Sequence, residues 1–68
     1  MTVREDVKAA MPIGVWMTTP EIRDKTGHDC SKIHFVLTRE VRWGFAEKGG
    51  MVHIPGCTAP VSTWRRLA

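Results

Sequence analysis

Residues 18–44 constrain the fold most, because they contain helix-capping and helix-ending residues that delimit two short helices separated by a tight turn. Thr18 or Thr19 is a suitable N-cap, and Pro20 stands in the first turn, where its missing N–H does no harm. Gly27 is the residue best able to end this helix in a left-handed conformation. The sequence therefore predicts a helix from about residue 19 to 26.

The second helix of the pair follows the turn at residues 28–30. Asp29 or Ser31 is its expected cap, and Gly44 ends it. Ile33, Leu37 and Val41 recur every fourth residue, which is the spacing of a buried helical stripe. We therefore predict a helix over about residues 30–43 with these three side chains turned inward.

The flanking segments predict one more helix and short strands. Residues 3–11 have helical spacing after a Thr2/Glu5 capping box, and Pro12 and Gly14 stop them. Residues 15–17 fit a single edge strand. Residues 45–54 and 61–67 fit a two-stranded hairpin that turns near residues 56–60, although Gly49-Gly50 is an alternative turn. The predicted fold class is α+β, with three helices and a small antiparallel hairpin.

Size and charge limit the classes of protein to consider. The chain has 68 residues, so we expect a single domain covering residues 1–68. No segment reaches membrane-spanning length and the first residues lack the apolar core of a signal peptide, so we expect a cytoplasmic location. The net charge of +3 is uneven, being −1 over residues 1–30 and +4 over residues 31–68. This basic half indicates a polyanionic partner.

Three segments of the chain carry a resemblance to a known family: TTPEIRDKTG, CSKIHFVLTREVRWGF and VSTWRRL. In this order they resemble the first helix of the motif, the recognition helix and the second strand of the wing in the winged helix-turn-helix family of small bacterial or phage regulators. The chain departs from the family at the His28-Asp29-Cys30 turn and in the bulk of Phe35 and Trp43. The resemblance implies a sequence-specific transcriptional regulator that binds double-stranded DNA, and not an enzyme.

The candidate DNA-binding residues follow from the inward stripe of the second helix. Facing away from that stripe near the N-terminal end of the helix are Ser31, Lys32, His34, Phe35 and Thr38. Arg39 and Arg42 lie further along, where they suit phosphate contacts, although an ordinary solvated surface is the alternative. Thr19 lies at the start of the first helix of the pair, where exposed backbone N–H groups would bind a phosphate. The alternative is that this threonine only caps the helix.

The predicted hairpin adds Lys48, His53, Arg65 and Arg66 as candidates for contact with the DNA backbone or minor groove. Strand alternation predicts that Trp64 and Arg66 share one face of the strand, whereas Arg65 lies on the other. We expect Trp16 and Trp64 to pack in the core. The position of Trp43 stays open between the edge of the core and an exposed site beside DNA.

Other chemistry has weaker support in the sequence. His28, Cys30, His34 and Cys57 contain suitable zinc ligands, but they lack the paired spacing of zinc sites, so we expect no metal. No phosphate-binding glycine loop or oxyanion feature is visible, and we expect no cofactor and no catalysis.

Two kinds of partner remain to be compared. The alternative to DNA is a protein such as a polymerase or a host factor, gripped by the second helix of the pair and the hairpin. Phe35, Trp43 and Met51 would then supply an apolar surface. If the partner is DNA, we also expect a homodimer or larger complex, because one small domain covers only a short site.

Overall fold

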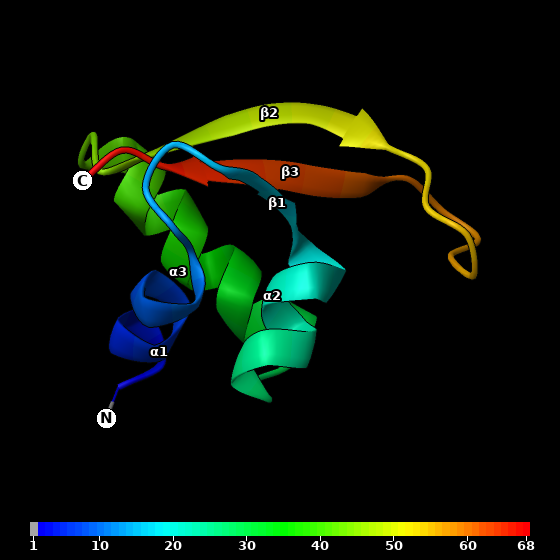
Figure 1. Cartoon of the computed structure of the whole chain (residues 1–68), viewed down its shortest axis with the longest axis horizontal. Coiled ribbons are helices and arrows are strands. Elements are labelled where there is room, and N and C mark those ends of the chain that lie inside the picture. Colours follow the sequence, from blue (N-terminus) through cyan, green and yellow to red (C-terminus); the bar gives the residue numbers. More distant parts are fainter. Residues whose placement is uncertain (1) are drawn as a thin grey trace.

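The computed structural model describes residues 2–68 and shows three helices packed against a three-stranded antiparallel sheet (Figure 1). The elements follow in the order α1 (Val3–Ala10), β1 (Trp16–Thr18), α2 (Thr19–Thr26), α3 (Cys30–Arg42), β2 (Ala46–Val52) and β3 (Val61–Arg66). The strand order is β1-β3-β2, so β1 is an edge strand as predicted. The α+β class and the three helices are confirmed.

The helix ends lie where local signals placed them. Thr18 caps α2 in a reciprocal capping box with Glu21, and Gly27 ends the helix in the left-handed region at φ 78°. Asp29 caps α3 by accepting a hydrogen bond from the backbone N–H of Lys32 at 2.9 Å. The turn between the two helices is therefore fixed by the left-handed backbone of Gly27 at one end and by the Asp29 cap at the other.

The hairpin of β2 and β3 turns within residues 53–60, beyond the Val52–Val61 pair. The alternative turn at Gly49-Gly50 is wrong, because both glycines lie within β2. They stand opposite the single residue Thr63, whose hydroxyl donates to the Gly50 carbonyl at 2.7 Å. Two residues facing one is a β-bulge, which bends a strand and increases its twist.

The core lies between the helices and the inner face of the sheet. Its buried side chains are Val7, Met11, Met17, Ile22, Ile33, Leu37 and Trp64. Ile33 and Leu37 are buried as predicted, and Val41 is partly buried against the same cluster. Trp16 differs from the prediction: it is 44% exposed, because it pairs with Arg65 on the outer face of the sheet, whereas Met17 beside it points inward.

Trp64 ties the sheet to the start of α2. It is 1% exposed, and its indole N–H donates to the Thr19 hydroxyl at 2.9 Å. That hydroxyl donates in turn to the Ser62 carbonyl at 3.5 Å. The only polar group of the largest core side chain is thus satisfied, as burial of a tryptophan requires.

Two arginines fasten α1 to the rest of the domain. Arg4 donates to the carboxylate of Glu40 on α3, a side chain that is almost completely buried. Arg66 donates to the carbonyls of Lys8 and Met11 at 2.9 and 3.4 Å, where α1 ends. A cation at this position adds hydrogen bonds to carbonyls at the C-terminal end of the helix, where its dipole favours positive charge.

Replacing Gly49 with alanine is expected to destabilise the domain by about 1–2 kcal/mol, because the space beside this residue is filled. A Cβ here would lie 2.4 Å from Thr63 Oγ1 and 2.7 Å from the Trp16 ring. Gly50 is the matched control, since a Cβ there meets nothing within 4 Å. Urea denaturation of both variants checks this, and equal losses for the two glycines would contradict it.

No helix within residues 2–68 is both long and apolar enough to cross a lipid bilayer.

Candidate functional site

One face of α3 forms an open groove of about 740 Å³. Its side chains come from α3 at successive three- and four-residue steps, together with one residue at the start of α2. They are Thr19, Cys30, Ser31, His34, Phe35, Thr38, Arg39 and Arg42. Seven of these eight are candidate site residues from the sequence, so the fold gathers most of that set on one surface.

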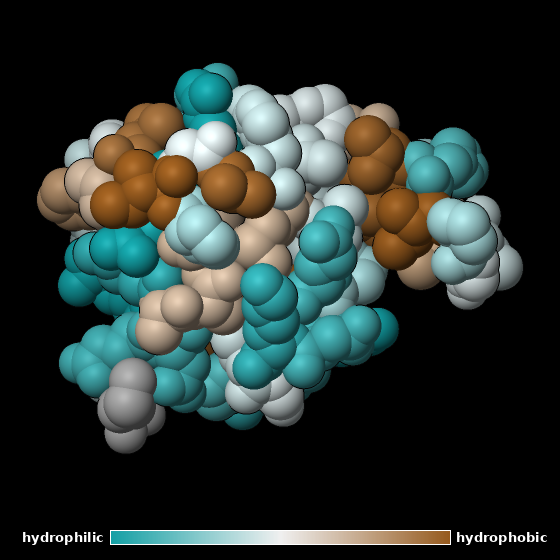
Figure 2. Space-filling model, in the orientation of Figure 1, coloured by the Kyte–Doolittle hydropathy of each residue, from teal (hydrophilic) through white to brown (hydrophobic). Residues whose placement is uncertain are grey.

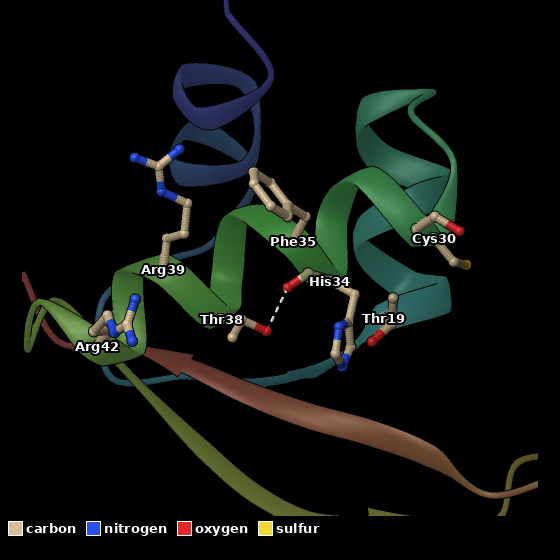
Figure 3. Close-up of a pocket in the computed structure, with 8 residues that line it drawn as sticks. Thr19, Cys30, His34, Phe35, Thr38, Arg39 and Arg42 are labelled. Carbon is tan, nitrogen blue, oxygen red and sulfur yellow. Dashed lines mark hydrogen bonds between the residues drawn. The ribbon is translucent and has the colours of Figure 1, made fainter.

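The groove has two sides along the helix axis. In Figure 3, His34 and Thr38 point toward the sheet, whereas Phe35 and Arg39 point toward the side on which α1 lies. The Thr38 hydroxyl donates to the His34 carbonyl at 2.7 Å and keeps its lone pairs free to accept. The side facing the sheet therefore offers hydrogen-bonding groups, and the side facing α1 offers an apolar ring and a cation.

The charged side chains that line this groove are all positive. None of its lining residues is acidic, and Arg39 and Arg42 are both exposed. Among residues 2–68, no carboxylate lies within ion-pairing distance of either guanidinium. Both arginines are consequently free to bind an anionic partner.

Arg39 lies against two exposed aromatic rings. Its guanidinium carbon is 5.6 Å from the centre of the Phe35 ring and 4.9 Å from that of Trp43. The other neighbour of Trp43 is Arg4, at 5.6 Å from the ring centre. Such cation–π contacts restrict the side chains that make them and keep the guanidinium groups at the surface. Trp43, which the sequence left open, is 48% exposed.

Glu40 does not neutralise the two groove arginines, because it points inward from α3. It is 3% exposed and pairs with Arg4. The hydrogen bond and charge of Glu40 raise the pKa of the Arg4 guanidinium above its ordinary value. No local sequence pattern predicts this pair, because its members are separated by 36 positions.

The β2–β3 hairpin contacts α3 through Trp64, whose ring lies against His34. The His34 ring meets the Trp64 ring edge-on, with 5.4 Å between their centres, and Lys48 Nζ on β2 lies 5.6 Å from the centre of that same ring. Lys48 is exposed, so its ammonium group extends the basic surface from α3 onto the sheet. His53 is exposed further out, in the loop between β2 and β3.

Arg65 and Arg66 occupy opposite faces of β3, as strand alternation predicted. Arg65 pairs with Glu47 and stacks on Trp16 at 4.9 Å, on the outer face. Arg66 reaches inward to the end of α1. Both cations already donate hydrogen bonds within the domain, whereas Arg39, Arg42 and Lys48 form no ion pair among residues 2–68.

The two remaining candidates lie at the margins of the groove. Lys32 is exposed and borders a smaller neighbouring hollow of about 280 Å³ that also includes Ser31 and Phe35. Thr19 lines the main groove but is 7% exposed, and its hydroxyl is engaged with Trp64 and Ser62. Thr19 could therefore contribute to ligand binding only through the backbone N–H groups at the start of α2.

The histidines and cysteines are dispersed. Within residues 2–68, no three His, Cys, Asp or Glu side chains are grouped so that they would hold a metal ion. His28 instead contacts Asp6 on α1 at 2.8 Å, and Cys30 and Cys57 are free thiols. Cys30 lines the groove, a position that the sequence analysis did not assign to it.

No family model matches the chain, and no similar curated protein or similar solved structure was found. The geometry and charge of the α3 groove therefore provide the basis for assigning a function.

Proposed function

We propose that the chain is a winged helix-turn-helix domain that binds double-stranded DNA in a sequence-specific manner and regulates transcription. In this proposal α2 and α3 are the helix pair, α3 is the recognition helix and the β2–β3 hairpin is the wing. The order of elements and the capped turn between α2 and α3 support it. The chain would act as a cytoplasmic binding protein without a cofactor and not as an enzyme.

The observation that carries the proposal is the exposed α3 groove, which has no acidic lining residue and whose two arginines have no acidic partner among residues 2–68. A duplex presents phosphates on both sides of its major groove, which is wide enough for one α-helix. A helix that enters this groove needs cations toward the backbone and small polar groups toward the bases. The α3 surface has both.

The proposed roles follow from position. Ser31, His34 and Thr38 would meet base edges, and Lys32 would donate to guanine O6 or N7. Arg39 and Arg42 would bind phosphates on one side of the helix. The wing would add the contacts of two further side chains, Lys48 and His53. Since one such domain covers only a few base pairs, we also propose that two copies bind together.

A protein partner is the second candidate, and the exposed aromatic residues favour it. Phe35 is 63% exposed and Trp43 48% exposed, and Met51 on β2 is 61% exposed. Figure 2 shows apolar side chains gathered at two places on one face of the molecule, near the hairpin and at the other end of the sheet. Arg39 packs against both the Phe35 and the Trp43 ring, however, which makes that surface less apolar than the residue types alone indicate.

A gel shift with mixed-sequence duplex DNA at low salt tests the proposal. We expect the unmodified chain to shift the duplex, and the double variant Lys32→Ala, His34→Ala to bind several-fold more weakly. Lys25→Ala is the matched control, because Lys25 is exposed on α2 outside the groove. An unmodified chain that leaves the duplex unshifted would rule out the DNA-binding function.

A further inference from the structure

Phe35 is the one groove residue whose side chain has no means of hydrogen bonding to a base. It is 63% exposed, lies near the middle of α3 and contributes nothing to the buried core. Around it lie polar and apolar side chains, with Ser31 one turn before it, Thr38 and Arg39 one turn after it, and Val36 beside it. A large apolar ring is thus presented to solvent on the open face of α3.

Arg39 contacts the ring at that position. The guanidinium of Arg39 lies 5.6 Å from its centre, and the same guanidinium lies 4.9 Å from the centre of the Trp43 ring. This contact leaves most of the Phe35 side chain exposed. The ring therefore stays accessible to a ligand that packs on it.

The major groove offers this ring one kind of apolar partner. The edges of all four base pairs display donors and acceptors there, and the only apolar group among them is the C5-methyl of thymine. Cytosine lacks that methyl group unless it is methylated at C5. Packing Phe35 against any other base edge would desolvate polar atoms without giving them new hydrogen bonds.

We propose that Phe35 confers sequence specificity by packing against the C5-methyl group of a pyrimidine in the major groove. The proposal rests on the DNA-binding function given above and adds one chemical requirement to it, a methylated pyrimidine at the position that the ring meets. Thymine meets this requirement in unmodified DNA, and 5-methylcytosine meets it in methylated DNA.

The test changes the DNA one methyl group at a time. A tight-binding duplex is first selected from a random-sequence pool with the full chain, and each thymine is then replaced singly by deoxyuridine. Loss of one buried methyl predicts a rise of about fourfold in Kd at one or two positions. Putting 5-methylcytosine in place of thymine there, paired with guanine, should restore more of the affinity than unmodified cytosine does.

Protein variants assign the effect to the ring. With Phe35→Ala, deoxyuridine and thymine at the sensitive position should bind equally, whereas Trp43→Ala should keep the discrimination. Trp43 is the matched control, because it is an exposed aromatic residue that shares Arg39 but does not line the groove. If Phe35 acts only as a support for Arg39, Phe35→Ala will weaken binding to both duplexes alike and leave the methyl effect unchanged.

Two further results, obtained with the unmodified chain, would also overturn the inference, and they are distinguishable. If the selected duplex is bound in a salt-dependent way but every deoxyuridine replacement leaves the Kd within about twofold, the methyl requirement is wrong while DNA binding stands. If no duplex is selected or bound at all, DNA binding itself is wrong, and the role of Phe35 fails with it. The deoxyuridine series uses the unmodified chain, so it does not depend on the folding of any variant.

Discussion

Replacing Trp64 with alanine is expected to destabilise the domain by about 3–5 kcal/mol. The side chain is 1% exposed and is the largest in the core, so its removal leaves a cavity between β3 and the helices. It also leaves the buried Thr19 hydroxyl without its donor. A domain of this length has a total stability of roughly 3–10 kcal/mol, so much of the variant will be unfolded at 25 °C.

Circular dichroism with urea denaturation measures this loss. The milder variant Trp64→Phe keeps most of the ring and removes the N–H group, and we expect it to cost about 1–3 kcal/mol. Trp43→Ala is the matched control, with an expected loss of about 1 kcal/mol or less, because Trp43 is 48% exposed. Equal stabilities for the Trp64→Ala and Trp43→Ala variants would contradict the core described here.

Removing both groove arginines is expected to weaken duplex binding by roughly 10- to 100-fold at low salt, since each would lose a charge-assisted contact to phosphate. Arg39 and Arg42 lie on the same open surface, and neither has an acidic partner among residues 2–68. The double variant should fold normally, because both side chains are exposed. Fluorescence anisotropy with a labelled duplex measures the change.

Arg23→Ala is the control for this effect. Arg23 is an exposed arginine on α2 that pairs with Asp24 and does not line the groove. Its removal should change the Kd by less than about threefold. If the Arg23 variant loses as much affinity as the double variant, binding depends on net charge alone, and α3 is not the interface.

The parts of this fold that could be predicted from the sequence are those set by neighbours along the chain. The Thr18 and Asp29 caps, the left-handed Gly27 and the stripe of Ile33 and Leu37 each depend on residues within a few positions of one another. A cap or a buried stripe can therefore be identified before any tertiary contact is known. The outward set on α3 follows from that stripe by geometry, and the structure gathers most of it in one groove.

The features that could not be predicted depend on pairing between distant segments. Gly49-Gly50 is a common turn signal, but here it faces Thr63 as a bulge, which only the register of β2 against β3 decides. Trp16 and Trp64 are equally apolar in the sequence, and the register places one on each face of the sheet. The burial of Glu40 likewise depends on Arg4, which belongs to another helix.

The salt dependence of duplex binding tests the central claim most directly. With Arg39, Arg42 and Lys48 as the candidate phosphate contacts, log K should fall linearly with log salt at a slope of about −3. Between about 50 and 200 mM salt this predicts a loss of affinity of roughly 40-fold. A binding constant that stays constant over this range, or no binding at the lowest salt, would contradict the assignment of the α3 surface to DNA.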